Sequence, residues 1–213
     1  MLPTPLETSE KTLPLLLVSA EDGYRIFSAS LKVVQKDFVV QSLKVDSRFV
    51  TPPAEVLPRI AEESKKLREI YAGFSQQRHW ANSFVRPVPG IITSEFGLKR
   101  VFNGEPRSRH KGVDFRAAEG AKIKALAAGT VVFASNTYYS GNLVVIDHGL
   151  GVFTSYSHLS ATKVKEGQLL EAGQLLGLAG STGRVTGPHL HLGLIVQGES
   201  QTPEPLMPNF RKK

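Results

Sequence analysis

Cysteine is absent from the 213 residues of the chain. The protein therefore has no disulfide framework, no thiolate nucleophile and no cysteine ligand for a metal. Any tetrahedral metal site has to be built from histidine, aspartate or glutamate side chains.

Long apolar segments are also missing. The longest uninterrupted apolar stretch runs from Leu13 to Val18, with Pro14 inside it, and is far too short to span a bilayer. The first residues, 1–7, lack the basic region and the apolar core of a secretion signal. We therefore expect no transmembrane segment, and either a cytosolic protein or a sequence that starts after a removed signal.

Basic residues are in excess but rarely clustered. The formal net charge is +7, which favours a polyanionic partner such as nucleic acid, acidic lipid or an anionic cell-wall polymer. Apart from residues 65–68 and 211–213, the lysines and arginines are scattered, and no stripe of arginines and aromatics resembles a nucleic-acid platform. We expect no nucleic-acid partner.

The composition, 41% hydrophobic and 21% charged, is that of a globular protein, and its pattern changes along the chain. Residues 1–50 alternate like short strands, at 15–18, 24–34 and 38–45, and predict a small β module that is short enough to be truncated. Residues 51–82 predict an amphipathic linker helix, with Thr51 as its cap and with Pro58 either separating or kinking its first turn.

The remainder, residues 83–203, is dense in glycine and in short β-like runs without a long helical pattern. This pattern predicts a mainly β domain, an antiparallel sandwich or barrel-like sheet, followed by a basic tail at 204–213. An internal echo relates residues 119–132 to residues 166–176, each with the pattern strand, glycine turn, strand.

The stretch from Gly187 to Leu194 carries two histidines, His189 and His191, among alternating leucines. In a strand both imidazoles would point to the same side, because strand side chains alternate with period two. One imidazole could then hold a metal while the other faces whatever the metal holds. The structural alternative, two neighbouring surface histidines, gives no reason for their pairing.

A second cluster contains His110 and Asp114, four residues apart on either side of Gly112. An even offset would place both on one face of a strand. Two histidines and one carboxylate are a familiar ligand set for catalytic zinc, which leaves a coordination position open for water. A surface histidine and a turn aspartate remain the alternative.

Three further histidines, His158, His148 and His79, lie outside these two clusters. His158 ends the strand-like run 152–156 and is either a loop residue or an acid/base group, since an unperturbed imidazole titrates near neutral pH. His148 lies in a turn-like sequence and His79 lies near a helix end. For both, a structural role is the favoured interpretation.

Taken in order, the motifs resemble the signature of the lysostaphin/LytM-type zinc metalloendopeptidases that cut peptidoglycan. They are His110-xxx-Asp114, Tyr156-x-His158-Leu159 and His189-x-His191, with matching residues at 93–97 and 180–188. The resemblance covers residues 85–196. More loosely, the first part of the chain looks like the β module and helix that precede this domain in some secreted bacterial relatives.

The resemblance implies a β fold of the duplicated hybrid motif type, with Zn²⁺ held by His110, Asp114 and His191 and a water as fourth ligand. It implies that His158 and His189 are the catalytic pair, because no glutamate base of the HExxH kind is present. Gly112 would keep the backbone near the metal uncluttered.

The function implied is a zinc-dependent endopeptidase that hydrolyses peptide cross-links or stem peptides of peptidoglycan, secreted or in the cell envelope or periplasm. The alternative is a non-catalytic or latent cell-wall-binding domain that regulates a partner hydrolase. Degenerate relatives lack metal ligands, whereas every motif position here is filled. Latency could still come from an upstream segment that supplies a fourth ligand, or from residues 101–108 or the amino-terminal module obstructing the groove.

Overall fold

A computed structural model describes residues 8, 12–19, 25–34, 36–80 and 84–207. In this part of the chain the fold is mainly β, as the sequence predicts, with a single α-helix. The strands are β1 (Thr12–Ser19), β2 (Arg25–Lys32), β3 (Val40–Leu43), β4 (Ile92–Ser94), β5 (Lys99–Phe102), β6 (Glu105–Arg109), β7 (Val113–Arg116), β8 (Lys122–Lys124), β9 (Gly129–Thr137), β10 (Gly141–Gly149), β11 (Val152–Thr162), β12 (Leu169–Leu170), β13 (Leu175–Ala179), β14 (His189–Val196) and β15 (Glu199–Gln201). The helix is α1 (Leu57–Tyr71), and the 3₁₀ turns are η1 (Ser47–Phe49), η2 (Ala54–Val56) and η3 (Glu204–Leu206).

The largest sheet is antiparallel and has the strand order β12-β9-β10-β11-β14-β7-β4, with β8, β13 and β15 attached to it. One of its inner strands, β14, shows the period-two alternation of the sequence. Leu190, Leu192 and Leu194 are fully buried, and the first two join the main hydrophobic cluster, which also holds Phe115 and Tyr156. The histidines of β14 therefore lie on the opposite face of the sheet.

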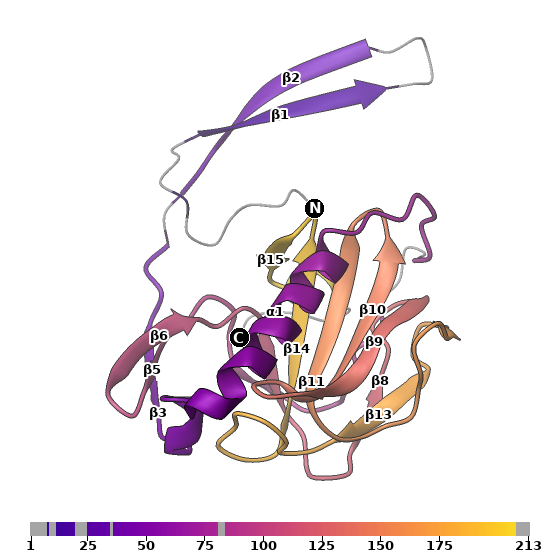
Figure 1. Cartoon of the computed structure of the whole chain (residues 1–213). Coiled ribbons are helices and arrows are strands. Elements are labelled where there is room, and N and C mark those ends of the chain that lie inside the picture. The colour runs from indigo at the N-terminus through magenta and orange to yellow at the C-terminus, as the bar shows by residue number, and fades with distance from the viewer. Residues whose placement is uncertain (1–7, 9–11, 20–24, 35, 81–83, 208–213) are drawn as a thin grey trace.

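That opposite face is covered at one end by α1, which crosses the sheet in Figure 1. Leu67, Ile70 and Tyr71 of α1 pack on a second buried cluster that includes Phe153 and Ile195. The other end of the same face, where β14 begins, is left for His189 and His191. The helix and the sheet thus confine the histidines to one end of the face.

The helix differs in detail from the prediction. It begins at Leu57, with Pro58 in its first turn, and η2 precedes it as a separate short element, one of the two alternatives that Pro58 raised. Thr51 does not cap it, because the residue before η2 is Pro53 and no side chain caps either element. A proline has no N–H that a side-chain cap could bond, and it is suited to a first helical turn as it stands.

The internal echo has a structural counterpart. The two halves pair with one another, β9 with β12 and β8 with β13, all antiparallel. Gly120 and Gly167, at equivalent places in the echo, have positive φ angles of 81° and 82°, a conformation that favours glycine.

The first three strands belong to two different sheets. β1 and β2 make a separate two-stranded hairpin, which projects from the rest in Figure 1, whereas β3 pairs in parallel with β5 in a three-stranded sheet of order β3-β5-β6. Phe38, just before β3, lies against Gly97 and under the guanidinium of Arg109, which holds this segment to the larger domain. The boundary at residue 50 stays a prediction, and β3 belongs spatially with residues 99–109.

The chain after β15 is partly packed. Glu204 and Met207 are buried, so the first residues of the expected tail belong to the fold, while residues 208–213 lie outside the described residues. No helix in the part of the chain that is described is both long and apolar enough to cross a membrane.

Candidate metal centre

Strand pairing brings the two sequence motifs together. In the register between β7 and β14, Asp114 lies directly opposite His191, and His110 stands just before β7. The three ligand atoms form a compact triangle. His110 Nε2 lies 3.0 Å from both Asp114 Oδ1 and His191 Nδ1, and His191 Nδ1 lies 2.8 Å from Asp114 Oδ1.

The position of His110 in the backbone differs from the prediction, which placed it in the same strand as Asp114. It is not in a strand, since β6 ends at Arg109 and β7 begins at Val113. The bend that carries Gly112 lies between them, and Gly112 packs against β14. A β-carbon on Gly112 would overlap the carbonyl of Leu192 and lie 2.7 Å from Cε1 of His191. The absence of a side chain there lets His191 approach the other two ligands.

Backbone carbonyls fix the tautomers of three histidines. Nδ1 of His110 lies 2.7 Å from the Glu95 carbonyl, Nδ1 of His158 lies 2.8 Å from that of Thr182, and Nδ1 of His189 lies 2.8 Å from that of Gly187. A carbonyl only accepts hydrogen bonds, so each Nδ1 carries the proton and donates. In a neutral ring, Nε2 then carries no proton and presents its lone pair.

The three ligand atoms of His110, Asp114 and His191 are suited to binding a cation. The bare Nε2 of His110 faces a carboxylate oxygen and a second imidazole nitrogen, and His191 Nδ1 could supply at most one proton to the three atoms. A divalent metal bound to all three atoms would satisfy every lone pair at once. Among the described residues, His110, Asp114 and His191 form the one group of this kind.

The charge states suit metal binding. Burial by itself would raise the pKa of Asp114, but the interactions with the adjacent His110 and His191 rings outweigh burial and hold that pKa well below its usual value. Burial lowers the pKa of His191 to about 4, against the opposing effect of Asp114. At neutral pH the group therefore offers an ionised carboxylate and a neutral imidazole, the forms that bind metals.

The two remaining motif histidines stand beside the triangle. The rings of His158 and His189 lie 4.9 Å apart between centroids, and Nε2 of His189 is 3.8 Å from Asp114 Oδ1. Burial, and next the nearby His189 and His191, lower the pKa of His158 well below its ordinary value. His158 also has a positive φ of 66°, which is uncommon for a residue with a side chain and marks a backbone bent to aim this ring.

His148 and His79 lie outside this group. His148 is buried in a separate polar network, with Nδ1 2.7 Å from the Ala128 carbonyl and Nε2 2.7 Å from the Thr154 hydroxyl. The backbone N–H of His79 donates to the His148 carbonyl.

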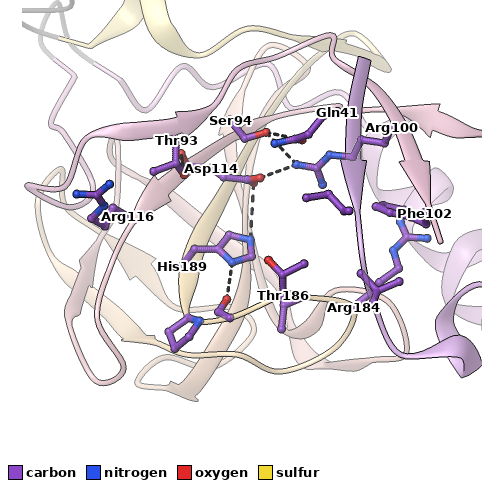
Figure 2. Close-up of a pocket in the computed structure, with 15 residues that line it drawn as sticks. Gln41, Thr93, Ser94, Arg100, Phe102, Asp114, Arg116, Arg184, Thr186 and His189 are labelled. Atoms are coloured by element: carbon purple, nitrogen blue, oxygen red, sulfur yellow. Dashed lines mark hydrogen bonds and ion pairs between the residues drawn. The ribbon is translucent and has the colours of Figure 1, made fainter. Parts of the chain in front are cut away.

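A pocket of about 380 Å³ opens on one side of the site (Figure 2). Asp114 and His189 line it, facing Gln41 of β3 and Arg100 of β5. Arg100 donates to Asp114 Oδ2 at 2.5 Å. The sequence analysis missed Gln41 and Arg100, because neither belongs to a histidine motif and only the fold brings them to Asp114.

Comparison with known proteins decides the family. The model of peptidase family M23 matches residues 108–203. These residues belong to peptidase family M23. The matched region contains all five motif residues and nearly all of the large sheet.

Among similar relatives, the chain is 46% identical over 108 residues to the peptidoglycan DD-endopeptidase ShyA of Vibrio cholerae. This alignment covers 50% of this chain and 25% of ShyA. It is 33% identical over 175 residues to the peptidoglycan DD-endopeptidase ShyB of the same organism. This alignment covers 81% of this chain and 36% of ShyB. The chain thus spans about a quarter to a third of the length of these curated relatives.

Solved structures agree on the fold. A crystal structure described as an M23 peptidase of Pseudomonas aeruginosa superimposes with a TM-score of 0.73 at 29% identity, covering 97% of this chain and 77% of that one. A zinc-containing peptidase from Vibrio cholerae gives a TM-score of 0.53 at 37% identity, covering 59% of this chain and 39% of that one.

Proposed function

We propose that this protein is a zinc-dependent endopeptidase that hydrolyses peptide bonds of bacterial peptidoglycan. The observation that carries the proposal is the convergence of His110 Nε2, Asp114 Oδ1 and His191 Nδ1 to within 3.0 Å of one another, with two further imidazoles alongside. Two histidines and a carboxylate leave a zinc ion one open position, which is the arrangement of catalytic sites. Bound zinc supplies Lewis-acid chemistry, which activates water and polarises a carbonyl.

In this proposal His110, Asp114 and His191 hold the metal, and His189 and His158 move protons. The bare Nε2 of His189, beside Asp114, is placed to accept a proton from water. The proton that His189 accepts can pass to the leaving amine through the neighbouring His158, whose ring lies 4.9 Å away between centroids and whose pKa, lowered by burial, makes its protonated form a strong acid. The carbonyls of Thr182 and Gly187 keep both rings in the required tautomer.

The substrate proposed is a peptide cross-link or stem peptide, with the D,D cross-link as the first bond to test. The names of ShyA and ShyB, both peptidoglycan DD-endopeptidases, support this choice. The net charge of +7 suits an anionic wall polymer. Such a substrate implies a location outside the cytoplasm, in the periplasm or cell envelope or beyond it.

A latent or non-catalytic role is less well supported. All the motif positions are occupied, and no upstream histidine, cysteine, aspartate or glutamate in the described segments 8, 12–19, 25–34 and 36–80 joins the metal group as a fourth ligand. Strand β5 of the suspected obstructing segment pairs with β3 and β6 and lines the pocket, which keeps a volume of about 380 Å³ beside the site.

The test is mass spectrometry of the products formed from defined cross-linked muropeptides. We expect about one zinc per chain, release of the monomers that D,D cleavage produces, loss of release with a chelator, and its recovery with added Zn²⁺. A protein that holds zinc and cleaves none of a panel covering D,D, glycine-bridge and stem bonds would favour the regulatory alternative.

A further inference from the structure

The second oxygen of Asp114 is held from outside the histidine motifs. While Oδ1 faces His110 and His191, Oδ2 accepts a hydrogen bond from Arg100 Nη2 at 2.5 Å (Figure 2). The Arg100 side chain is only 17% exposed and that of Asp114 10%, so solvent screens this ion pair weakly.

A short polar chain holds Arg100 in turn. The same Nη2 lies 3.1 Å from the Ser94 hydroxyl, and that hydroxyl donates to Gln41 Oε1 at 3.0 Å. Gln41 lies opposite Arg100 in the parallel register of β3 and β5. Gln41 of β3 is therefore linked to Asp114 through the side chains of Ser94 and Arg100. Strand β3 itself lies outside the region that the family model matches.

We propose that Arg100, supported by Ser94 and Gln41, is a positioning residue that restricts Asp114 to a single-oxygen metal ligand. The proposal rests on the zinc centre of the proposed function. A carboxylate with both oxygens free can chelate zinc through both and fill the position that a catalytic site leaves open. A charge-assisted hydrogen bond from a guanidinium to Oδ2 competes with that second metal bond and fixes the plane of the carboxylate.

The arrangement is a poor way to stabilise a fold. Burying an arginine and an aspartate costs desolvation that their attraction often fails to offset. Arg100 is also left with a buried Nε that has no hydrogen-bond partner among the described residues. A polar group buried at such a cost calls for a functional explanation, and the orientation of a metal-binding carboxylate supplies one.

The experiment compares Arg100→Gln and Arg100→Lys with the wild-type protein after Co²⁺ is substituted for zinc. Four-coordinate Co²⁺ absorbs visible light more strongly than five-coordinate Co²⁺. We expect Arg100→Gln to lose part of this absorption and about 10–100-fold of kcat at an unchanged KM. Lysine keeps the charge but not the planar fork, so Arg100→Lys should lie between the two.

The matched control is Arg86→Gln. Arg86 is also partly buried, donates to the carbonyls of Val88 and Gly90 and lies over the ring of Phe115, the neighbour of Asp114. Its loss should lower the melting temperature and leave the Co²⁺ spectrum unchanged. A matching spectral change in this variant would show that general loosening suffices, and would overturn the proposal.

The inference is also overturned if Arg100→Gln binds Co²⁺ with the wild-type spectrum and turns over at the wild-type rate. If Arg100→Gln does not fold, Arg100→Lys is judged by the same two measurements. Wild-type protein that takes up no metal would overturn the proposed function and this inference with it, so the two failures are distinguishable.

Discussion

Replacement of Gly112 by alanine tests how the site is assembled. Gly112 lies between His110 and Asp114 and is buried against β14. An added β-carbon would overlap the Leu192 carbonyl and lie 2.7 Å from Cε1 and 2.8 Å from Nε2 of His191. Contacts this short cannot persist, so either the backbone before β7 or the imidazole of His191 has to move.

The size of the effect follows from packing. Forcing an additional methyl group into a well-packed site costs about 1–3 kcal/mol. If the chain relieves this strain by displacing His191, binding a metal requires the displaced ring to return. The same energy then weakens metal binding by about 5- to 150-fold.

The assay is a competition titration of Zn²⁺ against a chelator, with thermal unfolding of the metal-free protein measured in parallel. The matched control is Gly187→Ala, because a β-carbon on Gly187 would meet no heavy atom within 4 Å although the residue is just two positions from His189. We expect the control to bind zinc and unfold like the wild type. Equal zinc affinity and stability in the two variants would refute the steric argument.

The remaining predictions concern the separate roles of the histidines. His189→Ala should keep zinc and lose turnover, whereas His191→Ala should lose both; metal analysis with muropeptide cleavage checks this, and two variants that keep both properties would contradict the assignment. Burial lowers the pKa of His148 from 6.5 to about 4, so its neutral ring stabilises the fold fully above pH 6.5, and this contribution is lost as the pH falls toward 4. Denaturant titrations at pH 7 and pH 4 should show the stability difference between wild type and His148→Gln shrink by about 3 kcal/mol, whereas a pH-independent difference would count against a buried neutral imidazole.

Local sequence pattern predicted β14 well. The alternation of leucines with His189 and His191 reflects burial of one face of a strand, and the structure confirms the strand with the leucines fully buried. The same argument applied to His110 and Asp114 reached the right pairing by the wrong geometry. His110 precedes the strand, and a glycine bend brings it to Asp114. An even spacing cannot distinguish these two cases, because in both the two residues are four positions apart.

Which ring nitrogen of each histidine carries the proton could not be predicted from the sequence either. It depends on which carbonyl each Nδ1 meets, and those of Glu95 and Thr182 are 15 and 24 residues away from His110 and His158. The roles of the five motif residues came from a family resemblance and remain proposals, whereas the convergence of the three ligand atoms is an observation of the structure.

Parallel pairing of β3 with β5 could be predicted least of all, since 55 residues (44–98), including a helix, separate the two strands. An edge strand offers unpaired N–H and C=O groups to any extended segment, so the pairing leaves no mark in either sequence alone. Its consequence reaches the metal centre, because the pairing places Gln41 beside Ser94 and Arg100, and Arg100 on Asp114. A chain cut at the predicted boundary before residue 83 would expose an edge of β5 and remove one wall of the pocket. The structural unit that serves the candidate site therefore begins before β3, upstream of the residues that identify the family.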